Sequence, residues 1–145
     1  MTAFADTSAI VKRYVPERDH EEIERLSPPM VLGPVTRVEV ASALWRKHRL
    51  GVIASNDAAA LMAAFEADIE EGLYVVVALG PDVSDAASVV VEQHGLRAYD
   101  AVQLAAALVA RDALDDLDSF AAFDMDLRAA ASAEGFAVVP VLIER

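Results

Sequence analysis

Short runs of apolar residues alternate along this chain with longer stretches in which apolar residues recur every three or four positions. The short runs predict buried strands at 3–5, 30–32, 73–79, 119–123 and 136–141. The longer stretches predict helices at 7–15, 17–26, 37–49, 55–71, 82–94, 96–108 and 125–134. Strands that alternate with helices in this way predict an α/β fold, with three α/β/α layers around a central five-stranded parallel sheet.

Several local signals refine these predicted elements. Thr36 is expected to cap the helix at 37–49, because Glu39 follows three residues later as in a capping box. The spacing within that helix places Val38 on an apolar face with Ala41, Leu44 and Trp45. The polar run at 55–57 is expected to cap the next helix, and the acidic stretch at 111–118 is expected to be a solvated loop.

The composition is that of a compact protein. The chain has 145 residues, of which 55% are hydrophobic and 25% are charged, so we expect a single domain over 1–145. No apolar run approaches the roughly 20 residues that cross a bilayer. The start of the chain lacks the basic region of a signal peptide, so no membrane association and a cytoplasmic location are expected. The absence of cysteine excludes disulfides, thiolate zinc sites and a cysteine nucleophile.

The net charge of −12 counts against a protein with a uniformly basic nucleic-acid surface. Basic residues nevertheless cluster locally, at 12–13, at 37 and at 46–49. Acidic side chains gathered in a metal site would also add to the negative count, and a bound cation would offset them. The overall charge therefore does not decide the function.

Four acids from distant parts of the chain occupy similar positions in the predicted fold. Asp6 and Asp124 directly follow predicted strands, while Glu39 and Asp100 lie in the first turns of helices. In parallel α/β sheets, ligands bind at the carboxyl ends of the strands, so these side chains are expected to face one crevice. Simpler roles remain open for Asp6 as a helix N-cap and for Glu39 as the partner in a capping box. Asp126 is an alternative to Asp124 as the fourth acid, but it is interpreted first as an acid that favours a helix dipole.

Carboxylates gathered in one crevice repel one another and favour a divalent cation with oxygen ligands, such as Mg²⁺ or Mn²⁺. Such a site suits phosphodiester hydrolysis. The sequence contains neither a glycine-rich phosphate loop nor the G-x-S-x-G motif, which argues against nucleotide-dependent enzymes and serine hydrolases. A phosphate-accepting receiver site fits less well, because Thr7 and Ser8 follow Asp6 where a second acid would be expected.

Four segments resemble the sequence blocks of the PIN-domain ribonucleases, in particular the VapC-type toxins of bacterial toxin–antitoxin pairs. They are DTSAIVK at 6–12, TRVEVASAL at 36–44, LRAYDAVQLA at 96–105 and FDMDL at 123–127. The resemblance implies endonucleolytic cleavage of RNA with Mg²⁺ or Mn²⁺. It assigns the metal-binding and catalytic roles to Asp6, Glu39, Asp100 and Asp124, with Ser8 as an accessory hydroxyl. It also implies a cognate antitoxin and a homodimer.

One position departs from the family pattern. The family often has Thr or Ser two residues before the fourth acid, where this chain has Ala122. An alternative function is therefore a PIN-fold binding module with weak or lost catalysis, which acts through a protein partner. If RNA is the substrate, the candidate phosphate contacts are Arg37, Arg46 and Arg97, although each is equally compatible with a solvated helix charge.

Overall fold

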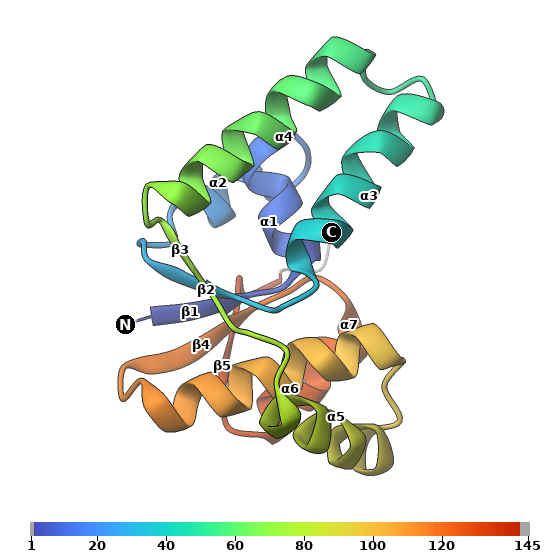
Figure 1. Cartoon of the computed structure of the whole chain (residues 1–145). Helices are drawn as coiled ribbons and strands as arrows, with labels where there is room; N and C mark the ends of the chain where they lie inside the picture. Colours follow the sequence, from blue (N-terminus) through green and yellow to red (C-terminus); the bar gives the residue numbers. More distant parts are fainter. Residues whose placement is uncertain (1, 143–145) are drawn as a thin grey trace.

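The structure is a computed structural model that describes residues 2–142. The protein consists of one sheet between two layers of helices (Figure 1). The strands are β1 Thr2–Ala5, β2 Met30–Leu32, β3 Tyr74–Val76, β4 Leu117–Ala121 and β5 Ala137–Val139. The helices are α1 Thr7–Tyr14, α2 His20–Glu24, α3 Thr36–Arg49, α4 Ser55–Glu70, α5 Pro81–His94, α6 Ala98–Ala113 and α7 Met125–Ala133. The five strands are parallel in the order β3-β2-β1-β4-β5, which confirms the predicted fold class.

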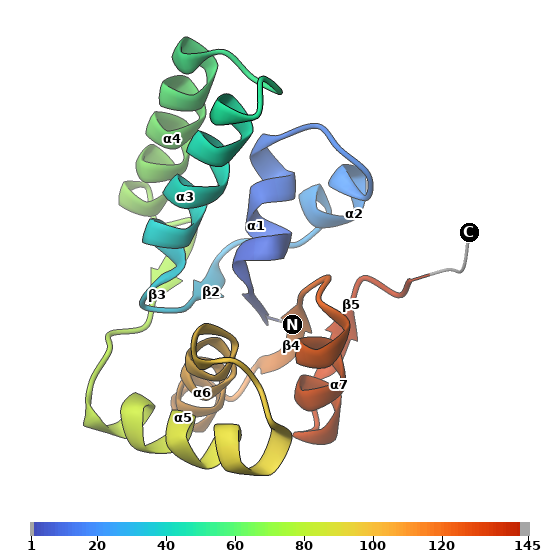
Figure 2. The same ribbon diagram turned by 90° about the vertical axis from the view of Figure 1, so that its right-hand side faces the viewer.

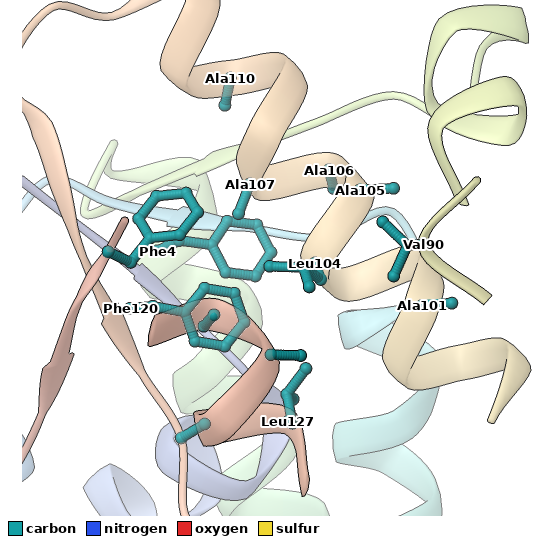
Figure 3. Packing of buried hydrophobic residues seen from close by; sticks show 14 of the residues in the cluster. Phe4, Val90, Ala101, Leu104, Ala105, Ala106, Ala107, Ala110, Phe120 and Leu127 are labelled. Atoms are coloured by element: carbon teal, nitrogen blue, oxygen red, sulfur yellow. The ribbon is translucent and has the colours of Figure 1, made fainter. Parts of the chain in front are cut away.

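The side chains of the central strand β1 alternate between the two faces of the sheet, as the period of a strand requires. Phe4 is fully buried on the face covered by α5, α6 and α7, where it aligns with Val31 of β2 and Phe120 of β4. The rings of Phe4 and Phe120 stack with their centroids 5.2 Å apart. Figure 3 shows both rings against α6, beside Leu104 and Ala107. The small alanines of α6 let this helix pack closely on the sheet.

The opposite face of the sheet is covered by the helices from the first half of the chain (Figures 1 and 2). Ala5 belongs to the core on this side, together with Ile10 of α1, Leu44 of α3 and Phe65 of α4. In Figure 2, α3 and α4 form an antiparallel pair that rises away from the sheet. The first turn of α3 therefore stays near the carboxyl ends of the strands, while its later turns extend beyond them.

Several predicted boundaries differ from the structure. Helix α6 continues to Ala113 and β4 begins at Leu117, so most of the expected acidic loop at 111–118 belongs to regular structure. The predicted helix at 17–26 shrinks to the five residues of α2. The predicted strand at 73–79 shrinks to β3, because this strand forms one edge of the sheet. Within residues 2–142, none of the helices combines the length and apolar composition that crossing a bilayer requires.

The predicted helix starts are also partly wrong. Thr36 is the first residue of α3 and Val35 occupies the N-cap position, without a side-chain capping bond. Ala54 takes the N-cap position of α4, so the polar run at 55–57 lies inside the helix. Val38 is 71% exposed, because the face of α3 that packs on the core carries Val40 and Leu44 instead. The capping signal of α3 was overridden by contacts that this helix makes with distant parts of the chain.

Candidate active site

Asp6 lies at the carboxyl end of β1, the central strand of the sheet, and is 6% exposed. Its carboxylate caps α1, since its Oδ2 accepts a hydrogen bond from the backbone N–H of Ser8 at 3.1 Å. The Ser8 hydroxyl donates to the same oxygen at 2.7 Å. The expected capping role is therefore confirmed, and the carboxylate is held in one orientation at the edge of the sheet.

The other three acids come from three further helix starts. Glu39 lies in the first turn of α3, and its Oε1 accepts a hydrogen bond from the Thr7 hydroxyl at 3.0 Å. This contact replaces the capping box predicted for Glu39. Asp100 lies in the first turn of α6. Asp124 is the N-cap of α7, where its Oδ1 accepts from the N–H of Leu127 at 3.0 Å.

A cavity of about 860 Å³ brings these four carboxylates together. Its acidic end is lined by Asp6, Glu39, Asp100 and Asp124, with the Ser8 hydroxyl beside them. The cavity extends along α3 over an apolar wall to the basic residues Arg46 and Lys47. The remaining lining residues are Thr7, Val35, Val38, Ser42, Ala43, Leu50 and Tyr99. The exposure of Val38 follows from this arrangement, because it faces the cavity.

Sequence and structure comparisons agree with this fold. The family model of the PIN domain matches residues 3–134, which includes all four acids. The chain belongs to the PIN-domain family. A solved chain described as a toxin-antitoxin complex from Klebsiella pneumoniae is similar to this PIN domain, with 17% sequence identity and a TM-score of 0.67. The similarity covers 95% of this chain and 96% of that chain, and at this identity it shows a common fold. No curated protein matches the sequence.

Burial and the charges of neighbouring acids raise the pKa values of Glu39 and Asp100 in this PIN domain. Burial is the largest cause for Glu39 and raises the pKa of its carboxyl, and the charges of Asp6 and Asp100 raise it further. The hydrogen bond from Thr7 acts in the opposite direction. Burial also raises the pKa of Asp100, and the charges of Asp6 and Asp124 add to this effect. These shifts show that the carboxylates are close enough to repel.

The donor chemistry of the site fits a hard divalent cation. Within residues 2–142, no three side chains of His, Cys, Asp or Glu form a ready-made metal-binding group, so the acids share a cavity without closing into one cage. Mg²⁺ typically uses only one or two carboxylates and keeps several waters, so it does not require such a cage. A cation in this cavity would also offset the repulsion that adds to the effect of burial on the pKa values of Glu39 and Asp100.

The three predicted arginine contacts are not equivalent. Arg46 lines the cavity. Arg97 is highly exposed and places Nη2 3.9 Å from Asp100 Oδ2 and 3.8 Å from Asp124 Oδ2. Pairs this exposed contribute about 0–1 kcal/mol, so Arg97 can move readily. Arg37 lies outside the cavity lining and pairs with Glu66 of α4 at 3.1 Å.

Two positions of the fourth sequence block, Ala122 and Asp126, lie outside the cavity lining. Ala122 is fully buried and contributes no hydroxyl, and its carbonyl accepts a hydrogen bond from Arg128 Nη1 at 2.7 Å. Asp126 is exposed and lies outside the cavity that holds the other acids, in a separate hollow beside His94. This placement favours its interpretation as a helix acid.

Sequence reasoning missed the polar support beneath the acids. Gln103 is fully buried, and its Nε2 donates to Asp6 Oδ1 at 3.1 Å and to Thr36 Oγ1 at 3.1 Å. A signal for this residue was present, because Gln103 follows Asp100 by three positions and therefore shares its helix face. It is also the one polar residue in the otherwise apolar run at 101–110. The contact to Thr36 explains why that residue does not cap α3.

Proposed function

We propose that the protein is a divalent-metal-dependent endoribonuclease that hydrolyses RNA phosphodiester bonds with Mg²⁺ or Mn²⁺. The observation that carries this proposal is the meeting of four carboxylates, from four separate chain segments, in one cavity of a PIN domain. PIN domains are typically metal-dependent nucleases. We further propose that it is the toxin of a VapC-type toxin–antitoxin pair, as its four sequence blocks suggest.

The proposed roles follow from burial and hydrogen bonding. Asp6 and Asp100 hold the cation most directly, while Asp124 completes its ligand set. Glu39 either binds the cation or orients the attacking water, and Ser8 fixes the Asp6 carboxylate. When bound, the cation supplies Lewis-acid stabilisation of the phosphate and a source of hydroxide at neutral pH.

The walls of the cavity suggest how RNA is held. Arg46 is placed to contact a phosphate several residues along α3 from the acids. Arg97 can exchange its weak contacts with Asp100 and Asp124 for a substrate phosphate. Arg37 would have to leave Glu66 to reach the substrate, so its predicted role is the least supported of the three.

Cleavage of a panel of end-labelled RNAs tests the proposed activity. The protein should cleave with Mg²⁺ or Mn²⁺ and stop when EDTA is added. Asp6→Asn and Asp100→Asn should each abolish cleavage, whereas Asp57→Asn should not, because Asp57 is an exposed first-turn acid of α4. Cleavage that persists in Asp6→Asn or Asp100→Asn would refute the assigned site.

The proposed partners are an antitoxin and a second copy of the chain. The similar solved chain belongs to a toxin-antitoxin complex, which supports an antitoxin as partner. A basic segment of such an inhibitor would complement the acidic end of the cavity. Coexpression with the product of a neighbouring small reading frame, followed by RNA cleavage assays, tests the antitoxin. Light scattering after size exclusion tests the expected homodimer. The expected cytoplasmic location is part of the same proposal.

The second candidate function is a binding module whose catalysis is weak or lost. The missing hydroxyl at Ala122 and the absence of a ready-made metal-binding group within residues 2–142 favour it. Calorimetric titration with Mn²⁺ separates the two candidates. A nuclease binds Mn²⁺ in a manner that Asp6→Ala abolishes, whereas a module without a working site gives no such binding.

A further inference from the structure

Gln103 joins three segments of the chain beneath the acidic end of the cavity. Its side chain is fully buried on α6, and the amide Nε2 bridges Asp6 Oδ1 and Thr36 Oγ1 at 3.1 Å each. The Thr36 hydroxyl also donates to Gln103 Oε1 at 3.4 Å. A buried amide is costly unless its hydrogen bonds are satisfied, and here one of its partners is a proposed metal ligand.

The hydrogen bonds on Asp6 fix the orientation of its carboxylate. An ionised carboxylate offers about four acceptor positions. The backbone N–H and hydroxyl of Ser8 both donate to Oδ2, and Gln103 donates to Oδ1. The Ser8 hydroxyl is itself held by a hydrogen bond from the N–H of Phe123 at 3.1 Å. Oδ1 is therefore the less occupied oxygen, and Gln103 is the residue within 2–142 that donates to it.

Gly33 provides the space that the Gln103 amide occupies. A Cβ atom on Gly33 would lie 1.8 Å from Gln103 Oε1 and 2.9 Å from its Cδ. Gly33 follows β2 directly and is buried, so the absence of a side chain there lets the amide reach Asp6.

We propose that Gln103 is a positioning residue, which holds the Asp6 carboxylate so that Oδ1 faces the cation in the cavity. This inference rests on the proposed metal-dependent function. Gln103 lies beneath Asp6 and does not line the cavity, so it acts through Asp6 rather than on the substrate. Partners of this kind typically alter metal affinity or activity about 10–100-fold when they are removed.

The test compares Gln103→Leu with the wild-type protein by calorimetric titration with Mn²⁺ alone. Gln103→Leu should weaken Mn²⁺ binding about 10–100-fold. In RNA cleavage it should lower kcat, with KM for RNA changed by less than about twofold, because no substrate contact is lost. Gln93→Leu is the matched control, since Gln93 is exposed on α5 and should leave both measurements unchanged.

Two further variants test the same network while keeping glutamine at position 103. Thr36→Val removes the second acceptor of that amide and should weaken Mn²⁺ binding by less than Gln103→Leu does. Gly33→Ala should displace the amide through the clash at Oε1 and weaken binding as well. Circular dichroism establishes that each variant is folded. If Gln103→Leu does not fold, the Mn²⁺ affinity of Thr36→Val decides the question.

The outcomes separate this inference from the proposed function. If Asp6→Asn abolishes Mn²⁺ binding while folded Gln103→Leu and Thr36→Val bind as the wild type does, the positioning role is refuted and the nuclease proposal stands. If the wild-type protein binds no Mn²⁺, both proposals fail. A graded loss from wild type through Thr36→Val to Gln103→Leu supports the positioning role.

Discussion

Replacing a carboxylate by an amide should have opposite effects on stability at two of the proposed metal ligands. Asp6 receives hydrogen bonds from Ser8 N at 3.1 Å, Ser8 Oγ at 2.7 Å and Gln103 Nε2 at 3.1 Å. The side chain of Asn offers one oxygen, so Asp6→Asn turns an NH₂ group toward at least one of these donors. Glu39 instead accepts one bond, from Thr7, which the Oε1 of a glutamine can still accept.

The magnitude for Asp6→Asn follows from the donors that lose their acceptor. Hydrogen bonds to charged groups contribute about 1.5–3 kcal/mol each, so the loss of one should lower the free energy of unfolding by about that amount. With a urea m-value of about 2 kcal/mol/M, the denaturation midpoint should fall by about 1 M. Glu39→Gln should raise the midpoint in metal-free protein at neutral pH. It removes a charge whose pKa is raised by burial and by the charges of Asp6 and Asp100.

The assay is urea denaturation in EDTA, followed by the fluorescence of Trp45, the single tryptophan of the chain. Asp57→Asn serves as the surface control and should change the midpoint by less than about 0.5 kcal/mol in free energy. The reasoning would be refuted if Asp6→Asn raised the midpoint as Glu39→Gln does. That result would mean that repulsion among the acids outweighs the donors around Asp6.

Three further predictions concern pH, substrate binding and the core. The pKa values of Glu39 and Asp100 are raised in the folded protein. Just above pH 4.5, the ordinary pKa of Glu39, the folded state therefore binds more protons than the unfolded state. Urea denaturation of metal-free protein should therefore show stability falling as pH rises through the folded pKa values. Arg46→Gln should raise KM for RNA in cleavage assays, because its side chain lines the cavity, whereas Arg37→Gln should leave KM unchanged. Phe120→Ala should lower the free energy of unfolding by about 3–5 kcal/mol in urea denaturation.

Each of these predictions has a matched comparison. Repeating the pH series with Glu39→Gln should flatten the decline in stability, and an unchanged slope would contradict the pKa argument. Equal KM changes in Arg46→Gln and Arg37→Gln would show that the cavity wall does not guide the substrate. Val52→Ala, at a site 63% exposed, should alter stability by less than about 0.5 kcal/mol, against the large loss expected for Phe120→Ala.

The alternation of strands and helices was predictable because it depends on local periodicity. The core residues Phe4, Val31 and Phe120 come from short apolar runs that the sequence displays directly. The positions of Asp6 and Asp124 were predictable for the same reason, since each follows a strand and parallel strands end at one edge. The two edge strands β3 and β5 are shorter than the predicted strands at 73–79 and 136–141, because apolar residues continue past the last paired position.

The predictions that failed depend on contacts between distant segments. Thr36 and Glu39 have the sequence of a capping box, but Thr36 pairs with Gln103 and Glu39 with Thr7. Val38 has the spacing of a core residue but borders the cavity. Local pattern cannot reveal these partners, because each contact forms only after helices α1, α3 and α6 have packed together.

The order of the strands determines when the candidate site can form during synthesis of the chain. Strand β1 is made first, whereas its neighbour β4 and the acid Asp124 are made after about three quarters of the chain. Strand β4 must pair with β1 to bring Asp124 to the cavity. A partly translated chain therefore lacks one wall of the acidic end. The four acids can therefore share one cavity only after β4 has been made and has paired with β1.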